Sequence, residues 1–548
     1  MDILLILSSK LISDEMKDLF GNIPSSLIPV SNKTLLELIY EKNKEKYDKI
    51  IVTGKEKIEL IEETIKNKKM NIEIVELDKL QDIGYSIYKS LIKFKEKNIK
   101  NLTINFADTY YSESLKLLKG RNVYLIGETS DSERWATFKI NEGKLTIYDK
   151  KDIISKNDRY SVLAGIFNFM NFKDFFKILD QIIKNEDYEK GEKDRFYKTI
   201  EKFYENSDVE LLNDGNNWID YGHFDYYHDA KKEVDARSFN TIQVDRKKGI
   251  LTKKSEHKEK LIKEIQWYLK LPKSLEYISP RIFDYSLSYT DPYVSMEYYS
   301  YGTLHEMFVY GDYSLNTWKK IFNRLLEINQ EFKSFTLTLE KSKIKKSLKD
   351  MYYKKTIDRL KDLKEDSRFE MFFDDEIVIN NKKIKSLGYI IPKLEEIIEK
   401  NELLENENYN IIHGDYFFAN ILYDKRNNII RLIDPRGNFG GYGIYGDNNY
   451  ELAKLLHSVD GKYDLIVEDL FEIKNINGAI DYKIFYSSKQ ESIKELFYEE
   501  LKKYKLPIKK IKLIESLLFI SMVPLHGDYY NRQLLMLSQG LEKINQFI

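Results

Sequence analysis

Two short segments in the second half of the chain carry residue types that can act together on a phosphate. The segment HGDYFFANILYD begins at His413 and places Asn420 five residues after Asp415. The segment LIDPRG follows, and in it an apolar run ends on Asp434. The apolar runs beside both segments predict short strands. We therefore expect two acids and one amide at strand ends close to one another.

Phosphoryl transfer needs such a set, because its catalysis consists mostly of positioning and of neutralising charge. We expect Asp415 to accept or orient the proton of a substrate hydroxyl. Asn420 and Asp434 offer the hard oxygen ligands that Mg²⁺ prefers. We expect His413 to brace the loop rather than to do chemistry. The alternative is that these are ordinary loop residues, since Asp and Asn favour turns for backbone reasons.

Both segments resemble those of the aminoglycoside phosphotransferase and choline kinase family, which shares the protein-kinase fold. The resemblance covers roughly residues 209–548. Within this range IDPRGNFG, IYGDNNYELAKLLHSVDGKYD and VPLHGDYYNRQLLMLSQGLE resemble kinase domains of capsule and surface-polysaccharide gene clusters. The resemblance implies an α+β protein of two lobes, a β-rich N-lobe over 209–300 and a helical C-lobe over 301–548. It also implies ATP and Mg²⁺ as cofactors and a small-molecule alcohol as substrate.

The same fold implies a lysine on a strand of the small lobe, paired with a glutamate on the following helix. GILTKKSEHKEKLIKEIQWYLKLP offers Lys253 and Lys254 at a strand end, and Glu264 at the edge of a helix's apolar face. Because side chains alternate along a strand, only one lysine can point into the cleft and bind the α- and β-phosphates. We favour Lys254. A solvated helix rich in Lys and Glu is the alternative.

Two further features of this region bear on ligands. YVSMEYYSYGTLHE resembles the hinge between lobes, where backbone groups meet the adenine, so Met296, Glu297 and Tyr298 are expected beside the nucleotide. A G-x-G-x-x-G loop does not precede the lysine strand, and its lack is common in the small-molecule branch of the family. Arg436 replaces the second acid often present in antibiotic kinases. It either binds charge on the substrate or has a structural role.

The first 185 residues alternate β-rich apolar runs with amphipathic helical stretches, as in KIIVTG followed by KIELIEETIKNKK. This alternation predicts an α/β domain with a mostly parallel sheet and helices on both faces. Residues 135–151 read instead as an antiparallel hairpin. A charged stretch with few apolar residues comes next, and we predict a linker over 186–208.

This first domain resembles the sugar-phosphate and choline-phosphate nucleotidyltransferases, which implies a Rossmann-like, GT-A-like fold. INFADTYY stands where that family has its metal-binding aspartate, here Asp108. The family's glycine-rich loop with an arginine is replaced by SSKLISDEMKDLFGN, and the lysine expected after Pro24 is Ser25. Without this cationic clamp, charge in the transition state is poorly compensated. We expect a degenerate domain, with Asp108 as a metal ligand if activity is retained.

Composition narrows the possible partners and locations. The 88 Lys+Arg against 89 Asp+Glu leave no basic excess for binding nucleic acid. With no cysteine, disulfides, thiolate-bound zinc and cysteine nucleophiles are excluded. The first residues lack the basic region and cleavage site of a signal peptide, and no stretch approaches the ~20 apolar residues that span a bilayer. We expect a cytoplasmic protein with no nucleic-acid partner and no membrane insertion.

The expected function is MgATP-dependent phosphorylation of a hydroxyl on a sugar, polyol or amino alcohol used for capsule or surface-glycan precursors. One alternative is a bifunctional enzyme, in which the first domain adds a nucleotidyl group to give an NDP- or CDP-activated alcohol. Another is a non-catalytic binding or scaffold protein, against which the intact Asp415, Asn420 and Asp434 argue. Substrate choice in this fold is made by the helical lobe and its insertions, here around residues 341–408.

Overall fold

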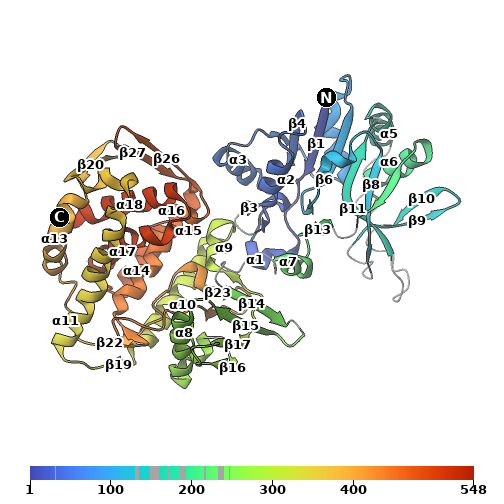
Figure 1. The fold of residues 1–548 in the computed structure, drawn as a ribbon. Coiled ribbons are helices and arrows are strands. Elements are labelled where there is room, and N and C mark those ends of the chain that lie inside the picture. The colour runs from blue at the N-terminus through green and yellow to red at the C-terminus, as the bar shows by residue number, and fades with distance from the viewer. Residues whose placement is uncertain are drawn as a thin grey trace. The chain divides into compact units, whose positions relative to one another are not determined.

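The chain folds into two compact units (Figure 1). The first comprises residues 1–235 with 310–312, and the second comprises residues 236–309 with 313–548. The computed structural model describes residues 1–30, 33–129, 135–148, 160–170, 172–185, 193–214, 217–231, 240–245 and 247–548. Within these ranges, no helix combines the length and the apolar character that crossing a membrane requires.

The first unit is built on a nine-stranded mixed sheet, in which β10, β9, β11, β6, β1, β4 and β5 follow one another and β8 joins β11 to β12. Its strands are β1 (Asp2–Leu7), β4 (Lys49–Gly54), β5 (Glu73–Glu76), β6 (Asn101–Phe106), β8 (Val123–Thr129), β9 (Thr137–Asn141), β10 (Lys144–Tyr148), β11 (Tyr160–Phe169) and β12 (Glu210–Asn213). The four strands β6, β1, β4 and β5 run parallel, and β11 runs antiparallel to its neighbours. The predicted hairpin forms from β9 and β10.

Helices cover this sheet because its central strands are apolar on both sides. In β1, Leu4 and Ile6 belong to one core while Ile3 and Leu5 belong to a second, and all four are fully buried. Alternate side chains of one strand thus face two helical layers, as expected for buried parallel strands. The helices are α1 (Asp14–Phe20), α2 (Leu35–Asn43), α3 (Ile58–Asn67), α4 (Ile83–Leu91), α5 (Phe172–Asn185), α6 (Arg195–Asn206) and α7 (Phe224–Lys231). The mixed α/β architecture expected for this part of the chain is confirmed.

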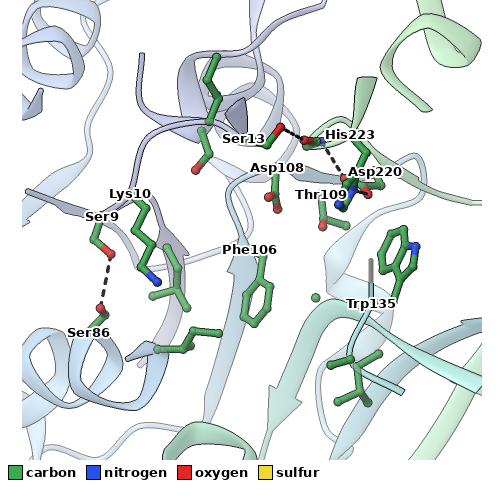
Figure 2. Close-up of a pocket in the computed structure, with 18 of the residues that line it drawn as sticks. Ser9, Lys10, Ser13, Ser86, Phe106, Asp108, Thr109, Trp135, Asp220 and His223 are labelled. Carbon is green, nitrogen blue, oxygen red and sulfur yellow. Dashed lines mark hydrogen bonds and ion pairs between the residues drawn. The ribbon is translucent and has the colours of Figure 1, made fainter. Parts of the chain in front are cut away.

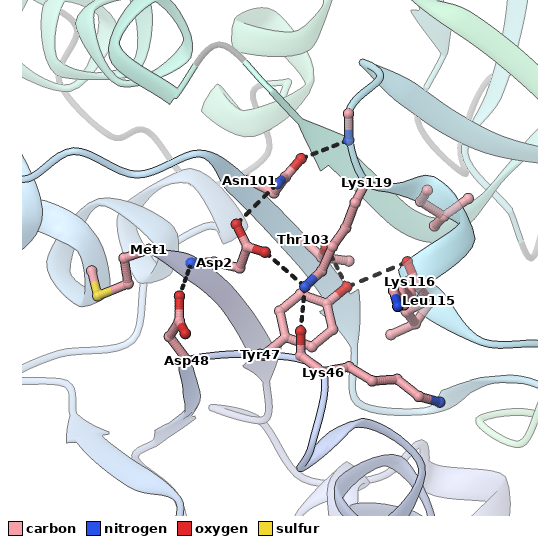
Figure 3. Close-up of polar contacts among 12 residues, drawn as sticks. Met1, Asp2, Lys46, Tyr47, Asp48, Asn101, Thr103, Leu115, Lys116 and Lys119 are labelled. Carbon is pink, nitrogen blue, oxygen red and sulfur yellow. Dashed lines mark hydrogen bonds and ion pairs between the residues drawn. The ribbon is translucent and has the colours of Figure 1, made fainter.

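A polar network fixes the amino ends of β1 and β6 (Figure 3). Asp2, the first residue of β1, accepts hydrogen bonds from Lys119 Nζ at 2.8 Å and from Asn101 Nδ2 at 2.9 Å. Burial acts to raise the pKa of Asp2, but these two donors outweigh it and the pKa lies below its usual value. The ammonium of Lys119 also lies 4.1 Å from the centre of the Tyr47 ring. This network is structural, and the chemistry-bearing residues lie at the opposite, carboxyl ends of these strands.

The first unit extends further along the chain than the sequence predicted. Within the expected linker, α6 forms and buries Phe196, Ile200 and Phe203 in the second core. Strand β12, at the start of the segment expected to form the N-lobe, pairs in parallel with β8. The apolar residues three and four apart in RFYKTIEKF form a narrow stripe that the high charge of the segment concealed. The boundary therefore lies at 235/236, and residues 209–235 belong to the first unit rather than to an N-lobe. Residues 186–192 lie outside the described residues.

The second unit begins with a small antiparallel sheet of order β14-β15-β17-β16. Its strands are β14 (Asn240–Asp245), β15 (Ile250–Ser255), β16 (Ile282–Ser286) and β17 (Tyr293–Glu297). Helix α8 (Lys258–Lys270) follows β15 and buries Leu261, Ile265 and Tyr268. This arrangement gives the small β-rich lobe with one helix that the sequence predicted, although it starts later in the chain.

Helices dominate the rest of the second unit. They are α9 (Leu304–Val309), α10 (Leu315–Lys333), α11 (Lys341–Lys349), α12 (Lys355–Lys364), α13 (Leu387–Lys400), α14 (Asn448–Val459), α15 (Tyr463–Val467), α16 (Ser488–Lys503), α17 (Ile508–Met522) and α18 (Tyr530–Ile544). Small sheets lie among them, built from β18 (Gly302–Thr303), β19 (Thr336–Leu337), β20 (Glu376–Ile379), β21 (Lys382–Lys385), β22 (Tyr409–Ile411), β23 (Ile421–Asp424), β24 (Ile429–Leu432), β25 (Tyr445–Gly446), β26 (Phe471–Ile476) and β27 (Ala479–Ile484). The two predicted acids lie in the segments that follow β22 and β24.

Candidate active site

The second unit contains a cavity of about 1140 Å³ in which most of the predicted residues meet. Small-lobe and helical-lobe side chains both line it. Among them are Lys253, Glu264, Asp415, Asn420, Asp434 and Arg436. Residues from three separate segments of the sequence thus share one space.

The loop that carries Asp415 is held by its main chain. The backbone N–H groups of His413 and Gly414 donate to the two carboxylate oxygens of Glu451, at 2.8 and 2.6 Å, and Glu451 is fully buried on α14. Gly414 has φ +82°, and a Cβ there would lie 2.6 Å from the Cβ of Arg436. Only glycine fits this combination of left-handed backbone and close approach. The loop is therefore fixed before any ligand arrives.

Asp415 lies beside a buried lysine that the sequence did not single out. Lys454 Nζ lies 3.2 Å from Asp415 Oδ1. Burial acts to raise the pKa of Asp415, but the positive charges of Lys454 and Arg436 outweigh it, so the pKa lies below its usual value. Asp415 is therefore ionised at neutral pH and can accept a proton. Asn420 Nδ2 donates to the Asp415 carbonyl at 3.0 Å, so the amide oxygen of Asn420 is the atom that could bind a cation.

Lys253, not Lys254, is the lysine that points into the cavity. Its ammonium lies 2.9 Å from both carboxylate oxygens of Glu264 and 2.8 Å from Asp434 Oδ1. Burial acts to lower the pKa of Lys253, but the two carboxylates outweigh it and raise the pKa. Lys254 faces the other side of β15, where it pairs with the exposed Asp291 at 2.9 Å. The preference for Lys254 is wrong, because the face that α8 covers decides the choice and the alternation rule does not reveal that face.

The predicted hinge residues lie outside the cavity wall. Met296 is buried in the core of the second unit. The backbone N–H of Glu297 donates to Arg281 O and that of Tyr298 to Gly249 O, both at 2.9 Å. These main-chain donors are used within the small lobe, and contact of the three residues with adenine stays a prediction.

Helix α8 is bonded directly to the segments that carry the two acids. Trp267 Nε1 donates to Ile412 O at 2.7 Å, and the backbone N–H of Asp434 donates to the hydroxyl of Tyr268 at 3.1 Å. Gly437 has φ +69°, and a Cβ there would lie 2.0 Å from the carbonyl oxygen of Lys263. The chain after β24 therefore packs directly against the backbone of α8.

The acids and the amide are chemically suited to a cation that arrives with its phosphates. Within the described ranges, no group of three or more His, Asp or Glu side chains gathers to hold a metal ion. Asp434 is half exposed, and one of its oxygens is paired with Lys253. Mg²⁺ commonly takes one or two carboxylates and fills its other positions with water and phosphate oxygens. Asp434 and Asn420 would hold it in that way.

His413 does not line the cavity. It is fully buried, and its ring lies edge-on to that of Trp267, with centroids 5.3 Å apart. Burial lowers the pKa of His413 to about 4. It is therefore neutral at physiological pH.

This lowered pKa predicts how stability depends on pH. Between the unfolded pKa near 6.5 and the folded value, the unfolded chain binds a proton at His413 that the folded chain does not. Stability should therefore fall as pH falls through this window, by on the order of 3 kcal/mol from this group. Urea unfolding at pH 7 and at pH 5 should show a smaller loss for His413→Gln than for the wild type. A loss equal to the wild type's would contradict the prediction, and the exposed His257→Gln is the matched control.

The first unit has its own, smaller cavity, of about 320 Å³, at the carboxyl ends of β1 and β6 (Figure 2). Asp108 and Lys10 line it, and so does Asp220 from β13 (Trp218–Asp220). Strand β13 pairs with β7 (Thr109–Tyr111), which sets Asp220 opposite Thr109 and brings it near Asp108. The sequence reasoning missed Asp220, since it lies in a segment expected to belong to the second domain.

Comparisons with known proteins find transferases among solved structures. No protein-family model and no curated protein matches the chain. The CTP:phosphocholine cytidylyltransferase from Streptococcus pneumoniae is 20% identical over 43% of this chain and 100% of its own, with a TM-score of 0.33. The inositol-1-phosphate CTP transferase from T. maritima is 16% identical over 43% and 98%, with a TM-score of 0.33. An aminoglycoside phosphotransferase in a ternary complex with streptomycin and ATP is 15% identical over 57% and 92%, with a TM-score of 0.35. Similarity at this level assigns no activity, and function rests on the geometry of the cavities.

Proposed function

We propose that the second unit transfers the γ-phosphoryl group of MgATP to a hydroxyl of a small metabolite. The observation that carries the proposal is the meeting of Lys253, Asp415 and Asp434 in one cavity. A phosphate-binding lysine, a proton acceptor and a magnesium ligand are the parts that the reaction needs, because it depends on positioning and on charge neutralisation.

Asp415 would act on the acceptor. Its carboxylate takes the hydroxyl proton as the hydroxyl oxygen bonds to the γ-phosphorus, the bond from that phosphorus to the β–γ bridging oxygen breaks, and ADP leaves. The nearby ammonium of Lys454 keeps Asp415 ionised. A depressed pKa makes Asp415 a weak base, so its main contribution is to orient the hydroxyl and to receive its proton late.

Lys253 would change partners when nucleotide binds. Without nucleotide its ammonium bridges Glu264 and Asp434. Phosphate oxygens would take the place of Asp434 at Lys253, while Glu264 continues to hold the lysine. Asp434 is then released to bind Mg²⁺, which when bound would neutralise the phosphate charge.

Nucleotide titration tests the proposal directly. Calorimetry with ATP should show binding in the presence of Mg²⁺ and much weaker binding in EDTA, since two protein ligands hold the cation together with the phosphates. A screen of sugars, polyols and amino alcohols for ADP release would then find the acceptor. Absence of magnesium-dependent binding would favour a scaffold over an enzyme.

Nucleotidyl transfer in the first unit is a second candidate, favoured by Asp108 and Asp220 lining one cavity with Lys10. Two carboxylates could hold the cation of a nucleoside triphosphate, and Lys10 could meet its phosphates. Pyrophosphate release from CTP and the other triphosphates with phospho-alcohols should then be abolished by Asp108→Asn. No release from any triphosphate would leave this unit with a binding role.

A role in capsule or surface-glycan precursor synthesis is part of the proposal and rests on the sequence resemblance. We also propose that the protein acts in the cytoplasm, where ATP is supplied.

A further inference from the structure

Four cationic side chains lie together on the helical-lobe wall of the large cavity. Lys355 and Arg359 come from α12, Arg436 follows β24, and Lys454 comes from α14. Three of them surround the ring of Tyr450. Lys355 Nζ lies 5.5 Å from its centroid, and Arg436 Cζ and Lys454 Nζ each lie 5.9 Å from it. These four residues are called the basic cluster below.

The basic cluster has more positive charge than its surroundings balance. In the part of the chain that the structure describes, its one ion pair joins Lys454 to Asp415. The Arg436 guanidinium donates to neutral acceptors, the Asn438 carbonyl and the Tyr450 hydroxyl, both at 3.2 Å. Arg359 donates to the carbonyl of Ser521 at 2.9 Å. None of these three neutral oxygens supplies a counter-charge.

The other acids of the cavity are engaged with other cations. Glu264 and Asp434 pair with Lys253, Glu259 with Lys263, Glu468 with His305, and Asp528 with Arg532. Burial, together with repulsion from the neighbouring cations of the cluster, holds the pKa of Lys355 well below its usual value. Gathered cations without counter-ions are unfavourable in a cavity, so an anion that entered would be bound strongly.

We propose that the acceptor carries an anionic group, a phosphate or a carboxylate, in addition to its reacting hydroxyl. This inference rests on the proposed kinase function. The anion would bind Lys355 and Arg359, because a guanidinium donates two parallel hydrogen bonds to either group. Lys454 is paired with Asp415. This pair places the basic cluster beside the carboxylate that receives the hydroxyl proton.

The nucleotide is the other possible source of negative charge, and the positions of the residues disfavour it. The phosphate-binding Lys253 lies on the small lobe and pairs with Asp434, whereas Lys355 and Arg359 lie on α12 of the helical lobe. The acceptor hydroxyl must approach the γ-phosphorus from the side opposite the leaving ADP, since the displacement is in line, and Asp415 would receive its proton on that side. The cluster would also repel a cationic acceptor, so the amino alcohols among the expected substrates are disfavoured.

Thermal unfolding of the full chain tests the inference with matched probes. Wild-type protein would be heated with and without saturating Mg²⁺ and a non-hydrolysable ATP analogue. Under each condition one probe would be added at about 10 mM and equal ionic strength: glycerol 3-phosphate, glycerate, glycerol or choline. We expect either anion to raise Tm by about 3 °C beyond the nucleotide, and glycerol and choline to raise it by less than about 1 °C. A larger shift with one of the two anions would show whether the cluster prefers a phosphate or a carboxylate. Equal effects of anionic, neutral and cationic probes would overturn the inference.

Variants then locate the anion. Lys355→Gln and Arg359→Gln should each remove the anion shift and keep the nucleotide shift. Lys361→Gln is the matched control, since it removes an exposed lysine from the same helix, and it should keep both. Loss of the nucleotide shift in the two cluster variants would show that the cluster serves ATP, which would also overturn the inference. If the anions raise the Tm of the wild-type protein and the nucleotide does not, the kinase proposal has failed instead.

Discussion

Asp415→Asn should lower the turnover of the proposed phosphoryl transfer by about 10²–10⁴-fold, the usual contribution of a positioned proton acceptor. The substitution removes the proton-accepting charge and keeps the shape of the side chain. The loop should keep its position, because the main chain of His413 and Gly414 is held by Glu451. Affinity for MgATP should therefore change little. ADP release and calorimetric titration measure the two quantities separately.

Asp424→Asn is the matched control for this experiment. Asp424 lies at the end of β23 in the same sequence segment, and it accepts a hydrogen bond from the backbone N–H of Arg426 at 2.9 Å, away from the cavity. The control should retain turnover within about twofold. Turnover by Asp415→Asn equal to that of the control would remove Asp415 as the proton acceptor.

Lys253→Met should destabilise the second unit by about 3–5 kcal/mol, because it leaves the buried carboxylate of Glu264 without its partner cation. It should also abolish measurable binding of MgATP, since no other lysine points from β15 into the cavity. Denaturant unfolding and nucleotide titration report the two effects. A third measurement, unfolding of Lys253→Met/Glu264→Leu, should recover part of the lost stability and none of the binding.

Lys254→Met is the control, as it removes the adjacent lysine from the same strand. Lys254 pairs with the exposed Asp291, and exposed pairs contribute 1 kcal/mol or less. We expect little change in stability or in nucleotide binding. A larger effect for Lys254 than for Lys253 would reverse the assignment made from the structure.

The positions of the two acids and the amide could be predicted from the sequence, because the local pattern of apolar residues determines where a strand ends. Asp415 and Asp434 both follow short strands, and these positions at strand ends, with the family resemblance, predicted that the two acids lie near one another. The choice between Lys253 and Lys254 depends on which face of β15 is covered by α8, and that is a tertiary property. The sequence placed Glu264 at the edge of the apolar face of a helix. In the structure Glu264 is buried and pairs with Lys253.

The sequence did not predict residues whose positions depend on packing between distant parts of the chain. Lys355 and Arg359 lie on a helix within the insertion around 341–408, about which the sequence indicated only that it shapes substrate choice. Lys454 left a readable signal, because it stands in LAKLL, a run that is otherwise apolar, on a buried helix. Helix α6 was missed for the same reason. The density of charged residues indicated a linker, but a narrow apolar stripe packs this segment against the core as a helix.

The close approach of Gly437 to the backbone of α8 has a thermodynamic consequence. Helix α8 carries Glu264, which pairs with Lys253, and it is hydrogen-bonded to the chain at Ile412 and Asp434. Since a Cβ at Gly437 would lie 2.0 Å from the carbonyl oxygen of Lys263, a displacement of α8 on nucleotide binding would push on the segment that carries Arg436. If this coupling operates, the affinities for nucleotide and acceptor would be linked reciprocally, and each ligand would change the dissociation constant of the other by the same factor.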